Sequence, residues 1–387
     1  MTYKGLLHTL LWSIILYSCS IANGYGQNYT FPFEIGKCSP LLTHDTISIT
    51  FVGDVMMHGR QIREALIVKS DNKNPESYNF GNFFRFIKDD IKKSDIAVAN
   101  MEFTVGTTPY SGYPLFSAPE SIIWEAQQSG FNLFLLANNH ILDKGKSGFE
   151  KTLELYSKNN AQYTGAYLSV EEQEREYPKM IRIRDLKIAF LNFTYSTNGF
   201  LVPKGSCVNR IDTTHIKEAI NKAKEQDADI IIAAPHWGDE YQSKANQKQR
   251  ELANFMISNG VHVIIGSHPH VTQDGYIDKN NVVFYSLGNY ISNQSVPANT
   301  QLGLMVTIKI VKNLITKDCY ISDAKYNYLW CFRGGEFLKD YTVVKIDDIL
   351  NKRIETLDSI KTIKAIKTYK KVIASEPIKN YKHKIEQ

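Results

Sequence analysis

The sequence has no internal repeat, no low-complexity segment and, after its first 30 residues, no apolar run near the roughly 20 residues that a membrane-spanning helix needs. Its hydrophobic fraction of 43% and charged fraction of 22% are close to the averages of globular proteins. These features exclude a repeat array, a disordered chain and a multi-span membrane protein. A chain of 387 residues is long enough for one large α/β domain with an appendage, or for two modest domains.

The sequence also lacks a strong excess of either charge. Its formal net charge is +5 with a pI near 8.7, and much of the surplus lysine lies in the last forty residues. No compact arginine and lysine cluster alternates with stacking aromatic residues, as a nucleic-acid groove requires. We therefore expect no nucleic-acid partner and interpret the lysines as a solvated basic helix or tail. Contact with an anionic surface or polymer stays open.

The one apolar stretch near the N-terminus, Leu6–Tyr17, is too short to span a bilayer. It follows an early cation and precedes small and polar residues, so residues 1–23 are expected to be an export signal. The letters LYSC within it resemble a lipoprotein signal that would place a lipid on Cys19. Ordinary cleavage near Gly24 or Gly26 is the alternative. Either route predicts a protein outside the cytoplasm, in the periplasm or at the cell surface.

Cysteine is scarce, with five in the chain. If Cys19 is acylated, an even number is left to pair in an oxidising compartment or to stay as free buried thiols: Cys38, Cys207, Cys319 and Cys331. The spacing does not choose between these alternatives.

Past a polar linker at residues 24–44, apolar runs alternate with amphipathic helical stretches. Examples of the runs are TISITFVGDV, FNLFLLANNH and VHVIIGSHPH, and examples of the helical stretches are TTHIKEAINKAKEQ and NQKQRELANFMISNG. This alternation predicts an α/β domain over residues 45–312 with parallel strands, joined late in the chain by antiparallel or mixed pairing. Residues 313–387 are expected to form a strand-rich extension followed by a basic helix.

Several predicted strands end in residues that can bind metals. Open α/β sheets place their sites beyond the carboxyl ends of the strands, so residues from distant segments are expected to converge there. Each residue alone has an ordinary explanation as a turn, cap or surface group. Together they form a suitable set for one or two divalent transition metals: Asp54, Glu102, Asn139, His236, His268 and His270.

The pair His268 and His270 is the most specific of these signals. In an extended chain, side chains two positions apart project to the same side. Pro269 between them stiffens the backbone, and Gly266 before them lets the chain pass close to a bulky neighbour. An accidental HPH turn is the alternative.

Six motifs resemble those of a known family in their order and spacing: FVGDVMMHGR, ANMEFTV, ANNHILDKG, PHWGDEY, GSHPHVTQ and YSLGNYI. Over about residues 46 to 293 they are similar to the CapA family of bacterial capsule or poly-γ-glutamate synthesis proteins, which is related to the calcineurin-like metallophosphoesterases. The resemblance implies a four-layer α-β-β-α sandwich with two mixed sheets and a centre for two divalent metals, such as Mn, Fe or Zn.

The resemblance also implies roles for individual residues. Asp54 looks like the leading metal carboxylate, Glu102 like the bridging carboxylate and Asn139 like an amide ligand, with His236, His268 and His270 completing the two metal sites. His140 would be the general acid, oriented by Asp143.

The chain departs from the related phosphoesterases at Met56, where they usually carry a histidine two positions after the leading aspartate. His58 is a candidate replacement, and it is grouped here with Arg60 and Asn138 as a candidate substrate contact. A surface cation that starts a helix is an equally good interpretation of Arg60.

Three functions are consistent with these residues. The first is an exported metal-dependent hydrolase that acts on a phosphoester or on an amide bond of an anionic polymer such as poly-γ-glutamate. The second is a non-catalytic envelope component that binds the anionic polymer during capsule assembly or export, and the third is a metalloprotein whose metals only hold the sheets together. The expected partner is an anionic polymer or a phosphorylated envelope substrate, with membrane attachment through a lipid at Cys19 as a further expectation.

Overall fold

The computed structural model describes residues 43–387, except 279, 358, 376 and 381–387. The expected export signal, Cys19, Cys38 and nearly all of the linker lie outside the described residues. Within that part of the chain, no helix is long and apolar enough to cross a membrane, and Cys207, Cys319 and Cys331 are free thiols.

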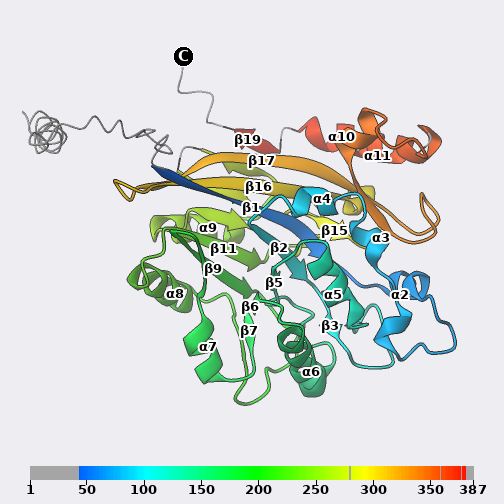
Figure 1. The fold of residues 1–387 in the computed structure, drawn as a ribbon, viewed down its shortest axis with the longest axis horizontal. Coiled ribbons are helices and arrows are strands. Elements are labelled where there is room, and N and C mark those ends of the chain that lie inside the picture. Colours follow the sequence, from blue (N-terminus) through cyan, green and yellow to red (C-terminus); the bar gives the residue numbers. More distant parts are fainter. Residues whose placement is uncertain (1–42, 279, 358, 376, 381–387) are drawn as a thin grey trace, which may run out of the picture. The chain divides into compact units, whose positions relative to one another are not determined.

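Two mixed sheets form the centre of the fold. The first has the strand order β18-β17-β16-β1-β2-β5-β6, with β15 also paired to β1. Figure 1 shows the blue β1 beside the yellow and orange β16 and β17, which come from the opposite end of the chain. Its strands are β1 His44–Val55, β2 Ile96–Met101, β5 Leu133–Leu135, β6 Tyr163–Thr164, β15 Asn289–Ile291, β16 Leu302–Asn313, β17 Cys319–Phe332 and β18 Thr342–Lys345.

The second sheet has the order β19-β13-β14-β12-β11-β9-β8. Its strands are β8 Lys179–Ile183, β9 Leu186–Thr194, β11 Ile230–His236, β12 Val263–Ile265, β13 Gly275–Ile277, β14 Val282–Phe284 and β19 Ile378–Asn380. Strands β9, β11, β12 and β14 are parallel, so their carboxyl ends meet at one edge. Two small ribbons lie outside both sheets: β3 Thr104–Val105 with β4 Ser117–Ala118, and β7 Ala166–Tyr167 with β10 Cys207–Val208.

Helices cover the outer face of each sheet. On the first sheet, the apolar sides of α2 Gly59–Ala65, α3 Gly81–Phe84, α4 Lys88–Ile91, α5 Ser121–Gln128 and α6 Gly145–Lys158 join one core cluster. On the second sheet, α8 Thr213–Glu225 and α9 Gln247–Ser258 form another. The remaining helical segments are α7 Val170–Glu176, α10 Ile346–Leu350, α11 Ser359–Ile373, η1 Pro75–Ser77 and η2 Ala298–Gln301.

The alternation of side chains along the strands explains the layers. In β1, Ile47 and Ile49 face the core between the sheets, whereas Val52 and Val55 face the helices. In β9, Ile188 lies between the sheets, and its neighbours on the strand alternate in the same way. Because both faces of each sheet are apolar, both must be covered, which gives a four-layer α-β-β-α sandwich. This confirms the predicted fold class.

The C-terminal residues are part of this sandwich. Strands β17 and β18 extend the first sheet by antiparallel pairing, while β19 pairs with β13 at the edge of the second. Helices α10 and α11 lie together beside β17 in Figure 1, and Ile366 and Tyr369 of α11 pack against the core between the sheets. The chain after residue 313 therefore connects the two sheets and closes one side of their shared core.

Candidate metal centre

The first sheet supplies carboxylate and amide side chains to the centre. Asp54 lies near the end of β1, and Asn100 and Glu102 lie at and just beyond the end of the neighbouring β2. Asn100 donates a hydrogen bond of 2.9 Å from Nδ2 to Oδ1 of Asp54, which fixes this carboxylate. Gly53 is required here because a Cβ at this position would lie 1.9 Å from the carbonyl oxygen of Gly288.

The second sheet supplies three histidines. His236 is the last residue of β11, and His268 and His270 lie in the loop directly after β12. Both loop histidines have positive φ angles, 97° and 57°, which side-chain-bearing residues adopt rarely and at a cost in free energy. At Gly266 a Cβ would lie 1.9 Å from the carbonyl oxygen of Tyr285, so the close approach expected from this glycine is present.

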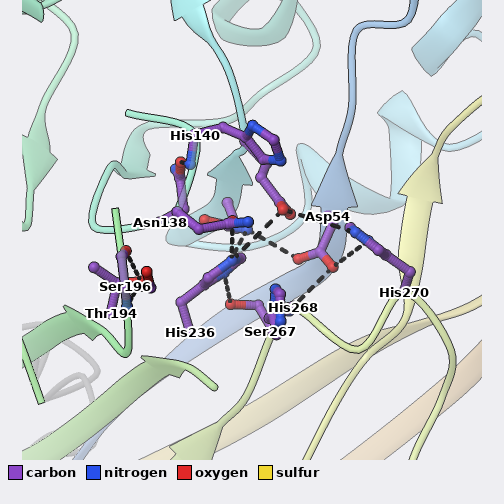
Figure 2. Close-up of polar contacts among 12 residues, drawn as sticks. Asp54, Asn138, His140, Thr194, Ser196, His236, Ser267, His268 and His270 are labelled. Carbon is purple, nitrogen blue, oxygen red and sulfur yellow. Dashed lines mark hydrogen bonds and ion pairs between the residues drawn. The ribbon is translucent and has the colours of Figure 1, made fainter. Parts of the chain in front are cut away.

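The carboxylates and histidines meet at the edge where both sheets end (Figure 2). The distance from His270 Nδ1 to Asp54 Oδ2 is 3.4 Å, and from His270 Nε2 to Glu102 Oε1 it is 3.9 Å. His236 Nε2 lies 3.5 Å from Glu102 Oε1. The backbone N–H of His268 donates to Asp54 Oδ2 at 3.2 Å. All five side chains are buried.

These side chains form two overlapping groups with the spacing of metal ligands. One consists of Asp54, Glu102 and His270, and the other of Glu102, His236 and His268; in each, the ligand atoms lie within 4.8 Å of one another. Glu102 belongs to both groups, as expected of a carboxylate that bridges two ions.

The unsatisfied polar atoms support a bound cation. Both carboxylate oxygens of Glu102, Nδ1 of His268 and Oδ1 of Asn100 are buried without a hydrogen-bond partner. A buried carboxylate without partners is costly, and native structures seldom tolerate one unless an ion compensates it. Because the orphaned atoms are oxygen and imidazole nitrogen donors, the residues fit divalent transition metals.

The two loop histidines differ in their electrostatic surroundings. Burial alone lowers the pKa of His270, but the carboxylates of Glu102 and Asp54 outweigh burial and raise this pKa to about 9. Burial, reinforced by His236 and His270, holds the pKa of His268 well below its ordinary value. In the protein without metal, His270 therefore carries positive charge between the carboxylates, and His268 is neutral.

The loop after β5 carries Asn139, His140 and Asp143. Oδ1 of Asn139 lies 2.8 Å from Nε2 of His236. Nδ1 of His140 lies 2.8 Å from Oδ2 of Asp143, which also accepts the backbone N–H of Phe116. Asp143 therefore holds the imidazole ring in one orientation, and the roles of these residues as ligand, general acid and orienting group remain predictions.

The three expected substrate contacts lie in different surroundings. Asn138 is fully buried, donates from Nδ2 to the carbonyl oxygen of Met101 and accepts the backbone N–H of His140, so its amide shapes the loop. Arg60 is paired with Glu64 at 2.7 Å and donates to the carbonyl oxygen of Gly334, which favours the interpretation as a structural cation.

His58 is linked to His140 through one aromatic ring. Its ring packs edge-on against Phe116 at 5.2 Å, and the ring of Phe116 also contacts His140 at 4.7 Å. Burial, despite the hydrogen bond that the ring can donate to Oε1 of Gln61, lowers the pKa of His58 to about 4. Met56, at the position of the usual histidine, is buried in the apolar core under the helices.

Two positioning asparagines were not singled out from the sequence. Asn289 lies opposite Asp54 in the parallel pairing of β15 with β1, and its Oδ1 is 3.1 Å from Nδ1 of His270. Asn100 precedes Glu102 by two positions, so strand alternation places both on the same side and was a usable signal. Asn289 lies within the motif YSLGNYI, but its place beside Asp54 depends on pairing with a strand more than 230 residues away.

Two further side chains complete the surroundings of the histidines. Oγ of Ser267 lies 2.9 Å from Nδ1 of His236 and fixes that ring. The ring of Tyr195, from the loop after β9, lies 4.5 Å from the ring of His268 and covers it. Tyr195 is 40% exposed, so it forms part of the solvent side of the centre.

Proteins with similar sequences come from capsule synthesis. Capsule biosynthesis protein CapA of Bacillus anthracis is 29% identical over 266 residues, which cover 65% of this chain and 61% of that protein. PGA biosynthesis protein CapA of Bacillus subtilis (strain 168) is 31% identical over 259 residues, covering 65% and 64%. The chain thus spans less than two thirds of the length of these relatives.

Solved structures with a similar chain path include two nucleotidases. NAD nucleotidase (NadN) of Haemophilus influenzae has a TM-score of 0.43 and 12% identity over 86% of this chain and 61% of that chain. The 5'-nucleotidase of Candida albicans SC5314 has a TM-score of 0.43 and 13% identity over 84% and 58%. With TM-scores below 0.5, these matches carry no weight in assigning the site.

A protein-family model also matches the chain. The model of the family described as bacterial capsule synthesis protein PGA_cap matches residues 48–294, which include every candidate site residue and the strands of the second sheet except β19. This range agrees with the resemblance found in the sequence motifs. The chain belongs to the PGA_cap family of bacterial capsule synthesis proteins.

Proposed function

We propose that this protein is a metal-dependent hydrolase of the cell envelope, which acts on a phosphoester or on an amide bond of an anionic polymer during capsule or poly-γ-glutamate synthesis. The observation that carries the proposal is Glu102, a fully buried carboxylate whose two oxygens have no hydrogen-bond partner and which is shared by two groups of potential metal ligands. A purely structural carboxylate would be expected to find hydrogen-bond donors within the protein.

The ligands proposed for two divalent cations, Mn, Fe or Zn, are Asp54, Glu102, Asn139, His236, His268 and His270. When bound, such cations act as Lewis acids that polarise a phosphoryl or carbonyl oxygen and make water a better nucleophile. The surrounding side chains hold the ligands in place. Asn100 orients Asp54, Asn289 binds Nδ1 of His270, and such outer contacts typically alter metal affinity or activity by about 10- to 100-fold when removed.

His140 is the residue proposed to give a proton to the leaving group. Its contact with Asp143 fixes the ring and directs the other ring nitrogen away from that carboxylate. Nδ2 of Asn198 lies 3.5 Å from Nδ1 of His140, and its Oδ1 accepts a hydrogen bond from Nδ2 of Asn139, so one asparagine connects the proposed acid with a proposed ligand.

A non-catalytic protein that binds the anionic polymer is the second candidate. Met56 favours it, because this apolar side chain is buried in the core where related phosphoesterases usually have a histidine. Loss of that histidine leaves the rest of the ligand set, which would suffice for a binding site that uses metals to attract anions.

The decisive experiment combines metal analysis with turnover. The purified protein would be tested with p-nitrophenyl phosphate, bis-p-nitrophenyl phosphate and poly-γ-glutamate, beside the variants His140→Ala and His215→Ala. His215 is exposed on α8 and provides a matched control. We expect two metal ions per chain in all three proteins and loss of turnover in His140→Ala alone. Equal rates for His140→Ala and the wild type on every substrate would contradict the catalytic proposal and favour the binding protein.

Export is proposed from residues 1–23, with a lipid on Cys19. Expression in a bacterium supplied with labelled palmitate tests the lipid directly. Label in the wild type but not in Cys19→Ser is expected. If neither protein is labelled and the N-terminus is cleaved near Gly24 or Gly26, the signal is removed by ordinary cleavage and Cys19 carries no lipid.

A further inference from the structure

A second site lies beside the centre, at the start of α2. Residues from α2, from the segment after it and from the loop between β3 and β4 line a pocket of about 490 Å³. Its charged and aromatic lining residues are Arg63, Tyr78, Tyr110 and Tyr113, and it is called the Arg63 pocket below. No function follows for it from the metal centre itself.

Among the described residues that line this pocket, Arg63 is the charged one. Within the described part of the chain, it has no ion pair and no side-chain hydrogen bond, whereas Arg60 on the same helix is bound by Glu64 and Gly334. Its guanidinium lies over the first residue of α2, since a Cβ on Gly59 would be 3.4 Å from Nη1 of Arg63. A free, exposed guanidinium can form two parallel hydrogen bonds with a carboxylate or a phosphate.

The tyrosines give the pocket stiff walls. The hydroxyl of Tyr78 donates to the carbonyl oxygen of Asn72 at 2.7 Å, and that of Tyr110 donates to the carbonyl oxygen of Lys73 at 3.2 Å. The two rings pack edge to face at 5.4 Å. Because both hydroxyls are engaged, the pocket is bordered by ring surfaces, and Arg63 provides its charge.

Two aromatic rings, Tyr113 and Phe116, link the pocket to His140. Gly59 in its wall follows His58, and Tyr113 packs at 6.3 Å against Phe116, whose ring contacts both His58 and His140. The loop is pressed onto the helix at Gly112, where a Cβ would lie 2.0 Å from the backbone N of Gly59. A chain-like substrate at His140 would therefore reach the Arg63 pocket by passing Tyr113, which is 75% exposed.

We propose that the Arg63 pocket binds an anionic group, a carboxylate or a phosphate, on the substrate unit next to the unit held at the metal centre. This inference rests on the proposed function, because it assumes that the substrate of the centre is an anionic polymer. It assigns to Arg63 the contact with substrate that the sequence suggested for Arg60, three residues earlier on α2.

The test measures binding separately from turnover. The full chain in EDTA would be titrated calorimetrically with a γ-linked glutamate hexamer and with a glycerol phosphate oligomer of equal charge. We expect Arg63→Gln to weaken binding of at least one oligomer by about tenfold or more, and to reduce the dependence of binding on salt. The oligomer that loses affinity identifies carboxylate or phosphate as the recognised group.

Arg182→Gln is the matched control, because Arg182 is exposed on β8 and donates only to the carbonyl oxygen of Arg184. Wild-type affinity of Arg63→Gln for both oligomers would overturn the proposal, even if the protein hydrolyses phosphoesters. Conversely, Arg63→Gln could lose affinity while neither the wild type nor any variant hydrolyses a substrate. That result would support the Arg63 pocket as a binding site and contradict only the proposed hydrolase activity. If turnover is present, Arg63→Gln is expected to raise KM for the polymer about tenfold with kcat kept, and to leave p-nitrophenyl phosphate unaffected.

Discussion

The two sheets contribute different chemistry to the same centre. The first brings oxygen donors, Asp54 and Glu102, which end adjacent parallel strands. The second brings nitrogen donors, His236, His268 and His270, at and just beyond the ends of β11 and β12. Neither sheet holds a complete ligand group alone, because each of the two groups combines Glu102 with at least one histidine. The packing of the sheets is therefore a condition for the proposed metal binding.

The two loop histidines, His268 and His270, differ in pKa because they contact different parts of the two sheets. His270 reaches across to the carboxylates of the first sheet, and its pKa is raised to about 9 despite burial. His268 stays among the other rings, and burial holds its pKa far below the ordinary value. The pKa values of two histidines separated by one proline are thus shifted in opposite directions, and a metal ion would replace the proton that His270 carries.

The largest expected effect comes from Glu102→Gln, which removes the one carboxylate common to both groups. We expect metal content to fall from two ions per chain to less than one, and turnover to fall by more than about 100-fold. Metal ions should raise the Tm of the wild type by about 5 to 10 °C at concentrations near 1,000 times Kd, and that of Glu102→Gln by much less.

Mass spectrometry of bound metal and thermal unfolding with and without EDTA measure these changes. Glu218→Gln, at an exposed position of α8, is the control and should behave as the wild type. If Glu102→Gln retained two ions, metal binding would not require a ligand shared by the two groups.

Smaller effects are expected for Asn100→Ala and Asn198→Ala, which alter contacts on different sides of the centre. Asn100→Ala removes the donor that fixes Asp54 and should lower metal affinity by about 10- to 100-fold. Asn198→Ala, in the loop after β9, touches His140 and Asn139, so it should reduce turnover more than metal affinity. Competition with a coloured chelator gives the affinities, and initial rates at saturating metal give the turnover. The same loss of affinity in both variants would remove the distinction.

His58 follows β1 of the first sheet. It should make the free energy of unfolding depend on pH. Its folded pKa of about 4 is below the unfolded value near 6.5, so the folded state binds fewer protons between these pH values. The stability that His58 contributes is present above pH 6.5 and is lost as pH falls toward 4. The loss should amount to about 2 kcal/mol.

Urea unfolding in EDTA at pH 7 and pH 4.5 measures this loss in the wild type and in His58→Asn, which retains a good residue at the start of α2. The variant should lose less stability over this range. An identical loss in both proteins would assign the acid sensitivity to other groups.

The smallest effect is expected for Arg60→Gln. Its pair with Glu64 is partly exposed and should contribute less than about 1 kcal/mol to the free energy of unfolding, with no change in KM. Denaturant unfolding and steady-state rates measure both quantities. A tenfold rise in KM would instead support the substrate contact first expected for Arg60 and weaken the case for Arg63.

Local patterns predicted much of the centre because strand ends are visible in a sequence. The apolar run before Asp54 and the HPH motif after VHVIIGS indicated both where the chain leaves a sheet and which side chains it carries there. Asn100 was within reach of the same reasoning, since it precedes Glu102 by two positions. Asn138 and Arg60 show its limit, because a polar residue near a predicted site gives no sign of which neighbour will bind it.

The sequence by itself determined the alternation of strands and helices, the types of ligand and the family, because these depend on residues near one another in the chain. Only the tertiary structure decided that Glu102 would meet histidines from the other sheet, that Asn289 would lie against His270, and that Arg63 would stay unpaired while Arg60 did not. The physical reason is that these contacts depend on the register of strands and on packing between sheets. Both are fixed by a core formed from residues distributed over the whole described domain.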